Sequence, residues 1–273
     1  GDRTILHERS RVEGLIPPLG AVGVGVTTST VRWGMLLLML GYLARHPELK
    51  PFHRVRWRPD GARVRRIAAI GTPIGGQMGM EMGIFALATV MMGWFGAVEL
   101  ASHQVALNIT STTFMIALGA SLAGSIRVGY HIGARNPHGV RRATVATYTL
   151  TLGFMGLCAL VFTTIPERLV GLYTSDAEIV ALGATLLVMA GVFQLFDGAQ
   201  VAGINILRGA ADTRVPMIFA AVGYWGVGLP TAYLLGFHSP LGPRGIWIGL
   251  AISLGVVAVM LGSRVRRGLG GRR

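Results

Sequence analysis

The feature that most constrains the fold is a series of seven apolar runs, each long enough to cross a lipid bilayer. They cover residues 20–43, 67–92, 100–126, 143–165, 179–207, 215–236 and 245–263. An apolar run of about 18 or more residues predicts a transmembrane helix. Lipid leaves backbone groups no outside partner, and the sequence lacks the short alternating segments of a β-barrel. We therefore predict an all-α membrane protein with about seven transmembrane helices.

The basic residues are concentrated in alternate loops. The chain has a net charge of +13 and contains 25 lysine and arginine residues. If the N-terminus lies outside, most of them fall on the cytoplasmic side, in loops 44–66, 127–142, 208–214 and 264–273. This is the positive-inside pattern, which predicts a cytoplasmic C-terminus. The basic loops then face lipid headgroups, so the expected partner is the bilayer and not nucleic acid.

The spacing of the runs divides the chain into two parts. The basic loop 44–66 separates the first run from the second, whereas the other six runs are joined by short connections. We predict that 1–66 holds one helix and a cytoplasmic linker, and that 67–273 forms a six-helix bundle with a short basic tail. The only cysteine, Cys158, excludes a disulfide within the chain.

Two carboxylates, Glu81 and Asp197, lie deep inside apolar runs, where Arg32 is the only other charged residue. A charge at mid-membrane costs several kcal/mol, so such residues usually mark the path of an ion, proton or substrate. At the rise of an α-helix, Glu81 lies roughly 22 Å past Arg66. Asp197 lies roughly 16 Å before Arg208 by the same rise. The similar depths allow one shared site.

A shared carboxylate site would bind a cation. Na⁺ is a hard cation that prefers oxygen ligands, and a buried carboxyl group can also take up a proton. Because either ion neutralises the site, a cationic substrate would compete with it for Glu81 and Asp197. We expect no cofactor beyond this coupling ion, and no metal site other than one for Na⁺. The alternative is a carboxyl group that stays protonated and hydrogen-bonds a neighbouring helix.

Other polar and aromatic residues could line the same space. The predicted lining residues are Gln77, Gln104, Asn108, Phe193, Gln200, Asn205 and Tyr224. Gln77 lies four residues before Glu81, so the two share a helix face. Phe193 and Asp197 have the same spacing. Interhelical hydrogen bonds are the alternative for the amides, and core packing is the alternative for the aromatic rings. We assign Arg32 to a structural ion pair with an acid of another helix.

The run 67–92 is rich in helix-perturbing residues. Gly75, Gly79 and Gly83 recur at steps of four, which predicts a face for close helix packing. Pro73 lacks a backbone N–H and should loosen the helix. The functional alternative is a hinge beside Glu81.

The sequence shows no sign of catalysis. It contains no nucleophile–base pair, no metal-ligand spacing and no phosphate-binding loop with its supporting context. An intramembrane enzyme would need one of these or an acid-rich diphosphate motif at the membrane interface. We therefore expect a transporter rather than an enzyme.

Four stretches of the chain look like parts of one known family. They are 71–109 (GTPIGGQMGMEMGIFALATVMMGWFGAVELASHQVALNI), 125–143 (SIRVGYHIGARNPHGVRRA), 193–217, which contains the pattern LRG-x-x-D-T-x-x-P-M, and 242–250 (GPRGIWIGL). Together they make the chain resemble the C-terminal part of the multidrug and toxic compound extrusion family, the NorM-like cation antiporters. The resemblance spans residues 20 to 263.

The resemblance implies a fold of twelve helices in two six-helix lobes that face a central cavity. On that pattern, 20–43 is similar to the sixth helix and 67–263 to the second lobe. The first five helices have no counterpart in the sequence, which begins at Gly1 without a methionine. We therefore expect either a fragment of a longer transporter or a truncated gene product, with the N-terminal lobe as its missing partner.

The function implied by the resemblance is secondary active efflux of small organic cations or drugs, in exchange for Na⁺ or H⁺, across the bacterial inner membrane. Glu81 and Asp197 match the family's second-lobe cation-site acids. Some members carry a tyrosine where this chain has Phe193, so that hydroxyl ligand is lost here. One alternative is a lipid-linked flippase of the same superfamily, whose cavity should hold more basic residues than Arg32. The other is a remnant that does not transport.

Overall fold

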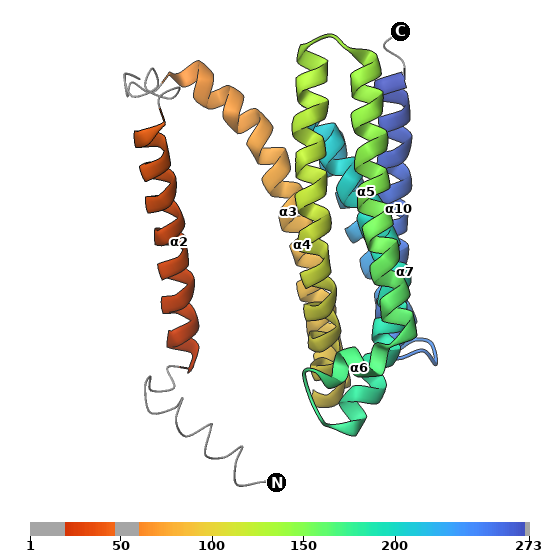
Figure 1. Cartoon of the computed structure of the whole chain (residues 1–273). Coiled ribbons are helices and arrows are strands. Elements are labelled where there is room, and N and C mark those ends of the chain that lie inside the picture. The colour runs from red at the N-terminus through yellow and green to blue at the C-terminus, as the bar shows by residue number, and fades with distance from the viewer. Residues whose placement is uncertain (1–19, 47–59, 271–273) are drawn as a thin grey trace. The chain divides into compact units, whose positions relative to one another are not determined.

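The computed structural model describes residues 20–46 and 60–270, which are helical almost throughout (Figure 1). They fall into two compact units, Gly1–Asp60 and Gly61–Arg273, which we describe separately. The predicted boundary at residue 66 falls inside a helix of the second unit, because that helix begins at Gly61.

The first unit contributes one described helix, α2 (Gly20–Arg45), which covers the first predicted run. It is long enough to span a bilayer, although it is not one of the six spans identified by length and hydropathy among the described residues.

The second unit is a bundle of helices. These are α3 (Gly61–Phe95), α4 (Ala97–Gly133), α5 (Pro137–Thr164), α6 (Pro166–Gly171), α7 (Ala177–Gly209), α8 (Arg214–Ala220), the π-helix η2 (Ala221–Gly228), α9 (Leu229–Phe237) and α10 (Pro243–Gly270). Because α8, η2 and α9 form one stretch, the described residues contain six helices long and apolar enough to cross a membrane. The six spans predicted for this part of the chain are confirmed.

Local capping explains where the helices begin. The Asn136 side chain accepts a hydrogen bond from the Gly139 N–H at 2.9 Å, and Pro137 occupies the first turn of α5. The Asp176 carboxylate does the same for α7, accepting from the Glu178 N–H at 2.9 Å. Both are short polar side chains that satisfy backbone donors left free at a helix start.

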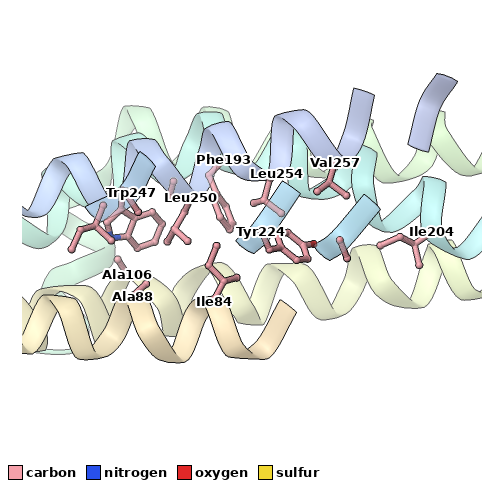
Figure 2. Close-up of a cluster of buried hydrophobic side chains, with 14 of the residues drawn as sticks. Ile84, Ala88, Ala106, Phe193, Ile204, Tyr224, Trp247, Leu250, Leu254 and Val257 are labelled. Carbon is pink, nitrogen blue, oxygen red and sulfur yellow. The ribbon is translucent and has the colours of Figure 1, made fainter. Parts of the chain in front are cut away.

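Helix α7 lies at the centre of the bundle and packs against α4, α5 and α10. Its Phe193 ring meets Trp247 of α10 edge-on, with 5.7 Å between ring centroids, inside the cluster drawn in Figure 2. His103 of α4 contacts the same indole and hydrogen-bonds Thr89 of α3 at 3.1 Å. Buried aromatic pairs of this kind stabilise beyond their apolar area, so they fix the depth at which the central helices meet.

Helix α3 runs continuously through Pro73, the first buried residue in it. The preceding turns are exposed, and in Figure 1 they lean away from α4 while the second half lies along it. The predicted glycine packing face is only partly correct. A side chain at Gly75 or Gly79 would meet open space, and only Gly83 is approached closely, by the Trp225 ring 3.0 Å from where a Cβ would lie.

Candidate functional site

Glu81 lies on the inner face of α3, where it is partly buried, and both of its carboxylate oxygens accept a hydrogen bond. Gln77, one turn earlier on α3, donates to Oε2 at 3.4 Å. Gln200 of α7 donates to Oε1 at 3.2 Å. Helix α3 packs chiefly against α4, α8 and η2, so the link to α7 at this depth is made by polar side chains.

A basic residue completes this group. The Arg208 guanidinium, near the end of α7, donates to the Gln77 Oε1 at 2.9 Å. It also interacts electrostatically with Glu81. Sequence reasoning missed this role and treated Arg208 only as a marker of the inner membrane face. The available signal was its spacing, because residues 197, 200, 204 and 208 recur at three- and four-residue steps on one face of α7.

Asp197 is buried on α7, with 6% of its surface exposed. Its charge interacts with that of Glu81, and its carboxylate accepts no hydrogen bond from residues 20–46 and 60–270. Two like charges in a low-dielectric interior repel strongly. A bound cation, or a proton held by one of the two carboxyl groups, would remove that repulsion. The arrangement can therefore bind one cation or one proton between α3 and α7.

Tyr224 adds a hydroxyl group to the same place. It belongs to the π-helix η2 and is 1% exposed. Its ring packs in the apolar cluster of Figure 2, while its hydroxyl interacts with the charges of Glu81 and Asp197 and lies beside Gln200. Of the predicted lining residues, the structure therefore brings Gln77, Gln200 and Tyr224 together around the two acids.

The remaining predicted lining residues lie elsewhere. Phe193 is buried between Phe85 and Trp247. Asn205 donates to the Ser121 Oγ at 2.9 Å, an interhelical bond between α7 and α4. These two side chains have the packing and bonding roles that the sequence left open as alternatives.

Gln104 and Asn108 are exposed on α4, and Asn108 accepts a 3.0 Å hydrogen bond from the Tyr173 hydroxyl. Arg32 is exposed on α2 and forms no ion pair with the described residues, so its predicted pairing stays a prediction. Within the described ranges, no three His, Cys, Asp or Glu residues come together as a metal site.

Comparisons with known proteins identify the family. The family model MatE matches residues 73–234. A probable multidrug resistance protein NorM from Mesorhizobium japonicum is 41% identical over 258 residues, which cover 91% of this chain and 55% of the relative. The multidrug resistance protein NorM of Burkholderia vietnamiensis is 39% identical over 254 residues, with the same two coverages.

A solved structure shows the same fold. A eukaryotic MATE transporter, AtDTX14, superimposes with a TM-score of 0.82 at 23% identity, covering 90% of this chain and 55% of its own. The chain thus spans about half the length of the relatives it matches. Six apolar helices and this kinship make it a multi-pass membrane protein. The chain belongs to the MatE family, the multidrug and toxic compound extrusion transporters.

Proposed function

We propose that this chain forms the second lobe, preceded by one helix of the first, of a transporter that exports organic cations or drugs in exchange for Na⁺ or H⁺. The transporter resides in the bacterial inner membrane. Similarity to NorM proteins that cover about twice this length supports the proposal. The first lobe would supply the other wall of a shared cavity.

The observation that carries the proposal is the convergence of Glu81 and Asp197. They come from helices α3 and α7, interact electrostatically, and share Gln200 as a neighbour. A purely structural pair of acids would be expected to have its oxygens fully hydrogen-bonded, because unpaired buried charge is costly. The Asp197 side chain has no such bond within the described residues, which favours a site that binds a cation or a proton.

Exchange follows from competition for this negative site. When Na⁺ or a proton neutralises the two carboxylates, the electrostatic attraction for a cationic substrate is lost and the substrate leaves. When the ion departs, the negative site attracts a new substrate. The ion gradient therefore drives export, since one site cannot hold two positive guests at full affinity.

The proposal is tested by ion-gradient-driven efflux of a cationic dye from vesicles that contain this chain joined to a first lobe. Glu81→Gln and Asp197→Asn should each abolish the response to the gradient while the protein still inserts in the membrane. Glu178→Gln, at an exposed acid in the first turn of α7, should behave as wild type. Unchanged ion-driven efflux in both site variants would refute the proposal.

The orientation of the chain can be tested independently. Helix α10 ends with Arg264, Arg266 and Arg267, and by the positive-inside rule this end lies in the cytoplasm. A reporter enzyme fused after Arg273 should be active only if it works in the cytoplasm. Activity of a periplasm-dependent reporter at that position would reverse the topology.

A further inference from the structure

The stretch α8–η2–α9 is interrupted by a rare backbone form. Residues Ala221–Gly228 form a π-helix, and the Leu229 N–H bonds to the Tyr224 carbonyl five residues earlier. Pro230 explains the loosened turn, because it has no N–H to offer the carbonyl one turn before it. The Ser253 hydroxyl of α10 donates to the Gly223 carbonyl at 2.9 Å. π-Helical turns are uncommon and are frequently found at functional sites.

The π-helix carries Tyr224, whose hydroxyl oxygen is buried among polar and charged side chains. The Tyr224 hydroxyl is buried and makes no hydrogen bond of ordinary distance and angle, although the Gln200 amide beside it acts on it, and the Oε1 of Gln200 is also unpartnered. An unsatisfied buried polar group costs about 1–3 kcal/mol, so it requires an explanation. Here the hydroxyl lies within electrostatic reach of both Glu81 and Asp197. Its surroundings supply the other oxygen atoms that a small cation would need.

A second tyrosine with a buried hydroxyl oxygen, on a partly buried residue, provides the contrast. The Tyr148 hydroxyl on α5 is likewise unpartnered, but it lies against Gly203, 3.0 Å from where a Cβ would be. Burial is the only influence on this hydroxyl, and no charged group among the described residues acts on it. Lack of a partner alone therefore does not distinguish Tyr224. The two carboxylates and the π-helical backbone do.

We propose that the Tyr224 hydroxyl oxygen is a third ligand of the cation held by Glu81 and Asp197, and that the π-turn positions it. The inference rests on the proposed function and adds a residue to that site. A hydroxyl group suits the task because the lone pairs of its oxygen can face a metal ion. A bound cation would therefore satisfy a hydroxyl group that makes no ordinary hydrogen bond in its absence.

The test is infrared difference spectroscopy of the purified chain in lipid nanodiscs, comparing spectra with and without Na⁺ and at high and low pH. Glu81→Gln and Asp197→Asn assign the carboxyl bands. In the wild type, a tyrosine ring band should change together with these bands. Tyr224→Phe should remove the tyrosine band and raise the half-saturating concentration of Na⁺ or H⁺ about fivefold, the effect of one hydrogen-bonding ligand. Tyr148→Phe is the matched control and should change neither.

The outcomes separate the two proposals. Carboxyl bands that respond without any tyrosine band, or a tyrosine band that persists in Tyr224→Phe, would overturn the role of Tyr224 and leave the carboxylate site standing. An equal loss of affinity in Tyr148→Phe would also overturn it, since any buried hydroxyl would then have the effect. If no carboxyl band responds to either ion, the cation site and the role of Tyr224 both fail.

Discussion

Gln200 of α7 donates its side-chain amide to the Glu81 carboxylate of α3, with 3.2 Å between Nε2 and Oε1. Gln200 is fully buried, and α3 packs mainly against α4, α8 and η2. This bond therefore positions the Glu81 carboxylate relative to Asp197, which lies one turn before Gln200 on α7.

Gln200→Leu should weaken cation binding about tenfold, because it removes a hydrogen bond to a charged group while nearly preserving side-chain volume. The readout is the half-saturating concentration of Na⁺ or H⁺ for the purified chain. Gln104→Leu is the control, since Gln104 is exposed on α4, and it should bind as wild type. Wild-type affinity in the Gln200 variant would show that the bond does not position Glu81.

Arg208→Gln should tighten cation binding about fivefold, because it removes a positive charge that acts on Glu81 and competes with the guest. Arg208→Lys keeps the charge but loses the planar fork that holds Gln77, so it should not tighten binding. The same cation titration measures both variants. Equal affinities for the two would mean that the charge of Arg208 does not compete with the bound cation.

The six-span bundle could be predicted from the sequence because span length and apolarity are local properties. The pairing of Glu81 with Asp197 could be anticipated for the same reason, since rise per residue gives depth in the membrane. Rotation of a helix about its axis is not a local property of the sequence. This rotation directs Phe193 toward Trp247 and Asn205 toward Ser121, although Phe193 and Asn205 lie on the same helix as Asp197.

Arg208 shows a different limit. It follows directly after an apolar run, where an arginine normally marks the membrane interface, and only the position of Gln77 across from it reveals its second role. The π-helix also could not be read from the sequence. Pro230 predicts a disturbed helix, but the extra residue per turn depends on how α10 packs against Gly223 and Gly228.

Gly249→Ala should destabilise the bundle by about 2 kcal/mol, because the added Cβ would overlap the backbone of Ala232 where α9 crosses α10. Gly262→Ala, in the same helix but facing open space, should be neutral or slightly stabilising through higher helix propensity. Thermal unfolding of the purified chain in detergent compares the two. Similar midpoints would contradict the close crossing of α9 and α10.

Ala211→Gly should raise thermal stability by about 1 kcal/mol, because Ala211 follows the end of α7 with φ of 61°, a conformation that costs an L-residue about that much. Ala210→Gly is the matched control. Its φ of −85° is ordinary, so glycine there should only add flexibility and lower stability slightly. A stability loss in both variants would contradict the left-handed turn at Ala211.

The most direct measurement of the central claim is the number of cations, Na⁺ or H⁺, that the purified chain takes up at saturation. We predict one cation per chain in the wild type, and loss of that uptake in Glu81→Gln and in Asp197→Asn alike. Two cations per chain, with each variant retaining one of them, would contradict a site in which both acids hold the same guest.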